Sequence, residues 1–150
     1  MDEAYAAINN VLVKLVNQIW EQEGKAIITD EFKDITNNDM HVIEAVGLNG
    51  GNNMSAIAKK LNITIGSLTT AMNQLVKKKY VERRRSEKDR RKVFIKLTEK
   101  GVRAYKHHED YHRQMTQAII DKLDKADMPV LVKMLDAVTE FFTEYSGVKA

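Results

Sequence analysis

The sequence contains no cysteine and a single proline, Pro129, among its 150 residues. Without cysteine the chain cannot form a disulfide, a thiolate zinc site or an oxidant-sensing thiol. The near absence of proline is typical of a mostly helical chain, because proline disrupts helix interiors. No apolar run reaches the roughly eighteen residues that a membrane-spanning helix needs. The acidic start MDEAYAAINN lacks the order of a signal peptide, so we expect a cytoplasmic protein without a membrane partner.

The usual signals of catalysis are also missing. The sequence has no glycine-rich phosphate loop and no cysteine nucleophile, and its serines do not lie in a nucleophile-elbow context. No pairing of carboxylates across a cleft can be argued from their spacing. We therefore expect that the protein is not an enzyme and that it requires no cofactor.

Residues 54–79 show the pattern of two short helices joined by a tight turn. Apolar residues recur at helical spacing in each piece: Ile57, Ala58 and Leu61 in the first, and Leu68, Ala71, Met72 and Leu75 in the second. The connection, residues 62–64, is too short for parallel packing, so the helices should cross steeply as in a helix-turn-helix. Thr64 is the natural N-cap of the second helix.

The outward face of that second helix is small and polar. It consists of Gly66, Ser67, Thr69, Thr70, Asn73 and Lys77. Small residues allow close approach to a surface, Asn and Thr can reach base edges in a major groove, and Lys can contact phosphate. An ordinary solvated helix face is the alternative, but it would more commonly carry pairs of Glu and Lys.

Positive charge is concentrated in residues 77–96. This stretch holds eleven Lys or Arg against three acidic residues, a net of +8, whereas the whole chain is +3 and the remainder is therefore −5. Val81 and the alternation of Val93, Ile95 and Leu97 predict two strands, with residues 86–91 as the exposed tip. A basic tip on a two-stranded ribbon suits the negative minor groove beside a recognition helix. Solubility alone would not confine the charge to one hairpin.

The segments SAIAKKLNITIGSLTTAMNQL and YVERRRSEKDRRKVFIKLTEKG resemble the winged helix-turn-helix of the MarR family of bacterial transcription regulators. The Asp-x-Arg of that family's wing falls on Asp89 and Arg91, and its LTEKG junction falls on residues 97–101. The resemblance covers nearly the full chain. One departure is Lys79, where the family usually has Gly; a left-handed backbone there would cost roughly 1 kcal/mol.

The resemblance, together with the residue pattern, predicts how the chain would contact double-stranded DNA. We expect Ser67, Thr69, Thr70 and Asn73 in the major groove, Arg91 in the minor groove, and Asp89 orienting Arg91 by charge pairing. The expected phosphate contacts are Lys77, Arg83, Arg84, Arg85, Arg90 and Lys92.

The predicted fold is mainly α with a small β-wing, about six helices and a two-stranded hairpin in one MarR-type domain, 1–150. The helix-turn-helix is 54–79, the wing is 80–97, and 2–23 and 99–146 are dimerisation helices. These terminal segments carry more apolar surface than one small winged domain can cover, and the resemblance to MarR implies a homodimer. Its two-fold symmetry would suit a pseudo-palindromic operator.

Two groups of residues are candidate effector sites. The first is His41, His108 and His112, because the i and i+4 spacing of the last two suits zinc. Some MarR-like repressors sense zinc through similarly placed histidines and an N-terminal acid, for which Glu21 or Glu23 could serve. Alternatively, these histidines are solvent-exposed or form a hydrogen-bonded junction between the DNA-binding and dimerisation regions.

The second group follows from a finer resemblance. NDMHVIEAVG, VERRRSEKDRRK and YHRQMTQAIID are similar to the FabT subgroup of MarR regulators, which repress fatty-acid synthesis genes with an acyl chain on acyl carrier protein as co-repressor. That subgroup has the three histidines without sensing zinc. The resemblance implies an acyl tunnel lined by Val16, Trp20, Ile27, Phe32 and Met115, although these residues could equally fill the dimer core.

Two other readings of function remain open. The first is a MarR-type regulator of another small lipophilic ligand. The second is a protein that does not bind nucleic acid and whose basic hairpin docks an acidic partner such as acyl carrier protein.

Overall fold

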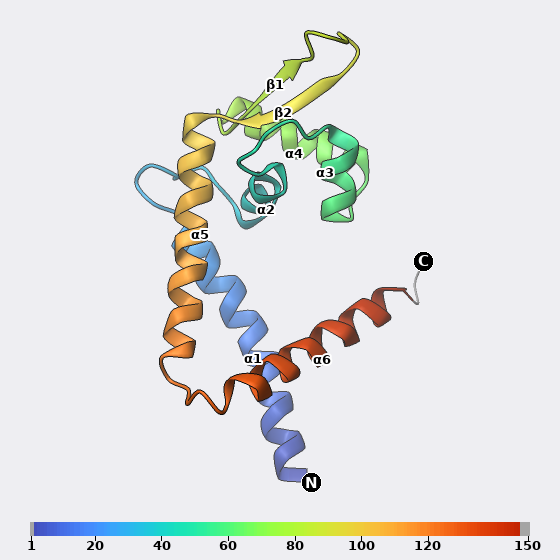
Figure 1. The fold of residues 1–150 in the computed structure, drawn as a ribbon. Helices are drawn as coiled ribbons and strands as arrows, with labels where there is room; N and C mark the ends of the chain where they lie inside the picture. The colour runs from blue at the N-terminus through green and yellow to red at the C-terminus, as the bar shows by residue number, and fades with distance from the viewer. Residues whose placement is uncertain (1, 148–150) are drawn as a thin grey trace. The chain divides into compact units, whose positions relative to one another are not determined.

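The structure, a computed structural model, describes residues 2–147; Met1 and residues 148–150, which the predicted 1–150 domain includes, lie outside the described residues. Within 2–147 there are six α-helices and one two-stranded sheet (Figure 1). Their bounds are α1 Asp2–Ile27, α2 Asn37–Val46, α3 Met54–Leu61, α4 Ile65–Lys77, β1 Val81–Arg85, β2 Val93–Leu97, α5 Glu99–Ile120 and α6 Met128–Gly147. The predicted class, mainly helical with a small β-wing, is confirmed.

The chain divides into two compact units, the first ending at Tyr111 and the second beginning at His112. The first unit contains α1 to α4, the sheet and the first part of α5. The second contains the last part of α5 and α6. The residues predicted to contact DNA all belong to the first unit.

The core of the first unit is formed where α2, α3, α4 and the sheet meet. Ile43, Leu68, Met72, Leu75 and Ile95 are fully buried there. Burying one such side chain contributes about 1.5–3 kcal/mol. The apolar stripes that the sequence predicts for α3 and α4 thus pack into one core, which holds the recognition helix α4 by its inner face.

The first turns of α2, α4 and α5 are capped by threonine side chains that accept backbone hydrogen bonds. Thr36 caps α2 by accepting a hydrogen bond from the Asp39 N–H, and the Asp39 carboxylate accepts one from the Thr36 N–H in return. Thr64 accepts a hydrogen bond from the Ser67 N–H at the start of α4, and Thr98 accepts one from the Gly101 N–H at the start of α5. The predicted cap Thr64 is therefore confirmed, and Thr98 caps α5 in the same way.

The first helix is longer than the predicted 2–23 and continues to Ile27. Gly24 lies inside the helix, where a Cβ would come 3.2 Å from Asn37 Oδ1, a close contact with a side chain. The Asn37 amide donates to the Trp20 carbonyl at 3.1 Å, which joins the start of α2 to α1. In the second unit α5 ends at Ile120.

The wing is an antiparallel hairpin in which Val81 pairs with Leu97 and Arg85 with Val93. Ile95 also donates a backbone hydrogen bond to the Asn52 carbonyl, so the loop before α3 adds a bridge to the sheet. Lys79, between α4 and β1, has φ +65°, the left-handed conformation that Gly would adopt without strain.

Apolar side chains are exposed along α1 and, in the second unit, along α6. Val11 and Val16 on α1 and Phe141 and Phe142 on α6 are each more than half exposed. Among the described residues, no helix has an apolar stretch sufficient to span a membrane.

Candidate nucleic-acid interface

The outer face of α4 is exposed while its inner face is buried in the core. The exposed residues are Gly66, Ser67, Thr69, Thr70, Asn73 and Lys77, the set that the sequence predicts for the outward face of this helix. Leu68, Met72 and Leu75 hold the helix from the other side. The arrangement presents a polar ridge on a rigid helix, which is the geometry that a major groove accepts.

Intrahelical hydrogen bonds define what the threonines offer outward. Thr69 Oγ1 donates to the Ile65 carbonyl at 2.7 Å, and Thr70 Oγ1 donates to the Gly66 carbonyl at 3.4 Å. A hydroxyl has only one hydrogen to donate. Each threonine therefore presents two groups outward. The lone pairs of its hydroxyl can accept from base amino groups, and its methyl group suits the thymine methyl.

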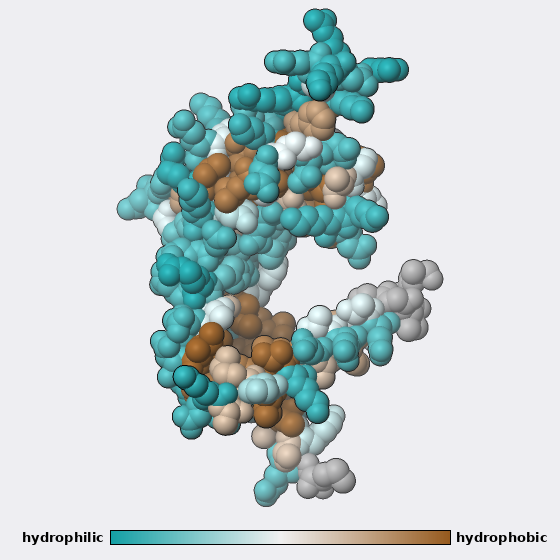
Figure 2. Space-filling view, viewed as in Figure 1, coloured by the Kyte–Doolittle hydropathy of each residue, from teal (hydrophilic) through white to brown (hydrophobic). Residues whose placement is uncertain are grey.

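At the tip of the wing, the side chain of Asp89 holds Arg91 in position. Asp89 Oδ1 accepts hydrogen bonds from the Arg91 backbone N–H at 3.1 Å and from Arg91 Nε at 3.4 Å. The Arg91 side chain is 93% exposed. Figure 2 shows hydrophilic, teal atoms over the wing, at the top of the view. The geometry agrees with the predicted pairing of Asp89 and Arg91 and leaves the guanidinium at the surface.

The basic residues of β1 differ in their neighbours. Arg83 Nη2 lies 2.6 Å from Asn73 Oδ1 on the recognition helix. Arg84 Nε lies 2.8 Å from Glu82 Oε1 on the same strand. Arg85 is exposed at the end of β1, and Arg90 and Lys92 are exposed near the tip. The structure thus joins the recognition helix and the wing into one basic surface.

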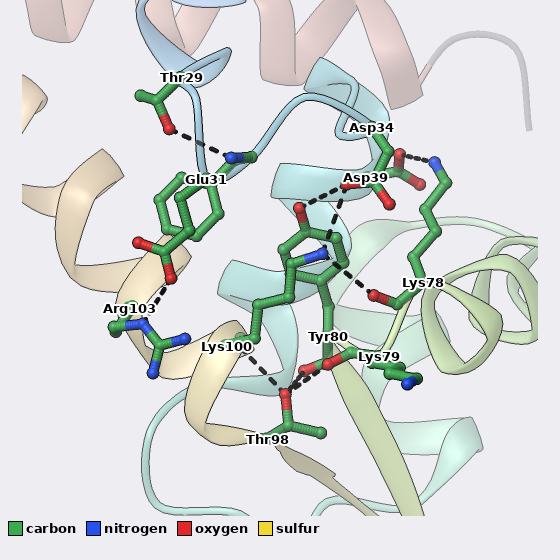
Figure 3. A network of polar contacts seen from close by, with 12 residues as sticks. Thr29, Glu31, Asp34, Asp39, Lys78, Lys79, Tyr80, Thr98, Lys100 and Arg103 are labelled. Atoms are coloured by element: carbon green, nitrogen blue, oxygen red, sulfur yellow. Dashed lines mark hydrogen bonds and ion pairs between the residues drawn. The ribbon is translucent and has the colours of Figure 1, made fainter.

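A polar network holds the end of α4 against α2 and the connection that precedes α2 (Figure 3). Lys78 Nζ lies 2.7 Å from Asp39 Oδ2, and the Tyr80 hydroxyl donates to Asp34 Oδ1 at 2.8 Å. Lys100 Nζ lies 4.1 Å from the centre of the Tyr80 ring and 3.5 Å from Asp34 Oδ1. These contacts brace the C-terminal end of the recognition helix and the base of the wing.

The same network shifts the pKa values of Tyr80 and Asp34. Burial, followed by the hydrogen bond to Asp34, raises the pKa of the Tyr80 hydroxyl well above its usual 10.0, so the hydroxyl remains a donor. Burial alone would raise the pKa of Asp34, but the hydrogen bond from Tyr80 and the charge of Lys100 outweigh it and lower that pKa. The sequence analysis missed this network because its partners are 39 and 46 residues apart.

A second polar junction is buried around His108. Its Nδ1 lies 2.8 Å from Glu44 Oε1 and its Nε2 lies 2.8 Å from Glu23 Oε1. A protonated imidazole can donate from both ring nitrogens, one to each carboxylate. Burial alone would lower the pKa of His108, but the hydrogen bonds with Glu44 and Glu23 raise it above 6.5. The junction joins α1, α2 and α5 within the first unit.

The other candidate metal ligands are His41 on α2 and His112 on α5. His41 Nδ1 lies 3.5 Å from Glu44 Oε2, and its ring stacks on Trp20 with centres 5.9 Å apart. His112 lies one turn after His108 on α5 and belongs to the second unit. Sequence reasoning considered Glu23 but missed Glu44, which contacts both His41 and His108.

The residues proposed for an acyl tunnel differ in burial. Ile27 and Phe32 are buried in the core of the first unit, whereas Val16 and Trp20 are more than half exposed on α1. Met115 is half-buried and belongs to the second unit.

Comparison with known proteins identifies the fold. The family model described as the MarR family matches residues 35–93, which contain α2, both helices of the helix-turn-helix and the start of β2. The chain is 34% identical to FabT of Streptococcus pneumoniae, solved in complex with DNA; the match covers 94% of this chain and 99% of that one, with a TM-score of 0.85. A MarR family transcription regulator, SP03579, has the same fold, with 16% identity, a TM-score of 0.77 and coverage of 97% and 93%.

Among curated proteins, the HTH-type transcriptional regulator PchR of Bacillus subtilis is 24% identical over 145 residues, which cover 88% of this chain and 85% of PchR. These relatives are transcription regulators and not enzymes. The exposed recognition helix, the basic wing and the match over almost the whole chain lead to one conclusion: the chain belongs to the MarR family and is a DNA-binding transcription regulator.

Proposed function

We propose that the protein is a cytoplasmic, homodimeric repressor of fatty-acid synthesis genes and that a long acyl chain on acyl carrier protein is its co-repressor. The observation that carries this proposal is the 34% identity to FabT over 94% of the chain. In the first unit, the residues expected to read bases lie exposed on α4, next to a basic wing. Both features suit a repressor that occupies its operator by direct readout.

The exposed apolar side chains of α1 support the dimer. Ile8, Val11 and Val16 are each 58–60% exposed in the single chain. Monomeric proteins rarely leave a continuous apolar stripe in water. A homodimer that covers the stripe would place two recognition helices about 34 Å apart, which is one turn of DNA.

Fluorescence anisotropy tests the proposal. The parent protein is titrated onto a selected palindromic duplex alone, with long-chain acyl carrier protein, with acyl carrier protein lacking the chain, and with zinc. We expect tighter binding only with the acylated carrier. Arg91→Ala, at the wing tip, is the matched control and should weaken binding in every condition without unfolding the dimer.

Trp20 provides a direct readout of ligand because it is the only tryptophan in the sequence. It is 53% exposed on α1 and stacks on His41. We expect its emission to shift to shorter wavelength when an acyl chain covers it. If the acylated carrier changes neither the Trp20 emission nor the affinity for DNA, the co-repressor assignment is contradicted. DNA binding itself would not be affected by that result.

Zinc sensing is the alternative effector hypothesis. A zinc ion binds a deprotonated imidazole nitrogen, and the hydrogen bonds with Glu44 and Glu23 raise the pKa of His108, so these contacts favour the protonated ring over the metal-binding form. The same anisotropy titration separates the two hypotheses. A response to zinc alone that His108→Ala abolishes would transfer the effector site to the histidines.

A further inference from the structure

A side-chain hydrogen bond joins the recognition helix to the wing within the exposed basic surface. Arg83 Nη2 lies 2.6 Å from Asn73 Oδ1, and both side chains are exposed. A guanidinium group has donors only, so the Asn73 atom that meets it must be the carbonyl oxygen and not the amide nitrogen. Arg83 therefore fixes the orientation of the Asn73 amide.

This orientation changes the hydrogen-bonding character of Asn73. An asparagine without such a partner commonly reads adenine, because its oxygen accepts from N6 and its nitrogen donates to N7. Here the oxygen lies against a positive guanidinium, which repels a further amino donor. The Asn73 oxygen keeps one lone pair beside that charge, but the Asn73 amide nitrogen and the remaining guanidinium N–H groups together form a surface that mainly donates.

Guanine is the base that matches such a surface. Its major-groove edge carries two acceptors, O6 and N7, whereas the adenine edge carries one acceptor and one donor. We propose that Asn73 and Arg83 act as a pair that selects guanine at one position of each operator half-site, with Arg83 as the positioning residue for Asn73. This inference rests on the proposed function, because it requires a sequence-specific operator.

The strand geometry separates this role from general phosphate binding. Successive side chains of a β-strand point to opposite faces, so Arg83 and Arg84 project from opposite sides of β1. Arg83 meets Asn73, whereas Arg84 meets Glu82 on its own strand. Arg84 is therefore a matched control: its replacement removes the same charge from the neighbouring position without touching Asn73.

Site selection from a randomised duplex library, followed by sequencing, tests the inference. The parent protein is compared with Asn73→Ala, Arg83→Ala and Arg84→Ala, and circular dichroism checks that each variant is folded. The base pair whose preference disappears in Asn73→Ala is the one that Asn73 reads. We expect guanine at that pair in the parent.

In Arg83→Ala the Asn73 oxygen is released, and the ratio of adenine to guanine at that pair should rise about fivefold or more. Arg84→Ala should weaken all sequences alike and keep the guanine. A guanine preference that survives Arg83→Ala, a parent preference for adenine, or no change in Asn73→Ala would overturn the inference while the repressor function stands. A parent protein that selects no sequence would overturn the proposed function and this inference with it.

Discussion

Gly101 of α5 lies against the backbone of Tyr80 so closely that a Cβ at residue 101 would come within 2.0 Å of the Tyr80 carbonyl oxygen. That carbonyl also accepts hydrogen bonds from the backbone N–H and the hydroxyl of Thr98. The contact fixes the start of α5 against the base of the wing, between the recognition helix and β1.

Gly101→Ala should destabilise the protein by about 3 kcal/mol or more, because the methyl group meets backbone that cannot move freely. Urea denaturation measures the free energy of unfolding. Gly66→Ala is the matched control, because its Cβ would meet nothing closer than 3.9 Å inside α4. It should stabilise the helix by about 0.5–1 kcal/mol. Equal effects of the two substitutions would contradict the close approach.

Lys79→Gly should stabilise the protein by about 1 kcal/mol. Lys79 has φ +65°, which costs an L-residue roughly that amount and costs Gly nothing. Thermal unfolding measures the change. Lys77→Gly, inside the last turn of α4, serves as the comparison and should destabilise by about 1 kcal/mol. A Lys79→Gly variant less stable than the parent would show that the left-handed turn is not strained.

The buried His108 should make stability depend on pH. Its pKa is raised in the folded protein, so its hydrogen bonds contribute fully below the unfolded value of 6.5 and are lost as the pH rises through the raised folded value. His108→Gln should cost about 2 kcal/mol or more near pH 6 and less near pH 9. Urea titrations of both proteins at the two pH values measure this difference.

Glu23→Gln is the control for that experiment, since it removes one of the carboxylates that raise the pKa of His108. It should flatten the pH dependence of the free energy of unfolding. A cost of His108→Gln that is the same at both pH values would show that His108 is not protonated at this junction.

Lys77→Ala should reduce the salt dependence of operator binding. Lys77 is exposed at the end of α4, where a Lys reaches the phosphate backbone. Removing one phosphate contact lowers the slope of log affinity against log salt by about one unit and weakens all sequences alike. Anisotropy titrations at several salt concentrations measure the slope. An unchanged slope would place Lys77 outside the interface.

Val11→Asp should shift the protein toward the monomer. Val11 is 58% exposed in the stripe of α1 that the proposed homodimer covers, and a buried charge without a partner is costly. Sedimentation velocity measures the oligomeric state. Asn10→Asp adds the same charge on the opposite face of α1 and should leave the state unchanged. If both variants sediment like the parent, the dimer contact lies elsewhere.

Local chemistry explains why much of the fold could be predicted. The caps Thr64 and Thr98 need only backbone N–H groups three residues away, and the stripes of α3 and α4 follow from helical spacing. The same locality explains the error at Gly24. A glycine usually signals a helix end, but in the structure Gly24 lies inside α1, next to the side chain of Asn37, thirteen residues later.

Periodicity and charge are read along the chain, so the recognition helix, its small polar outer face and the confinement of positive charge to one hairpin could be predicted from the sequence. Which polar groups meet depends on the fold. Tyr80 and Asp34 are 46 residues apart, His108 and Glu23 are 85 apart, and Arg83 reaches Asn73 only after the wing folds back toward α4. Hydrogen bonds act over about 3 Å, so no spacing in the sequence reveals a pair until the fold brings its members together.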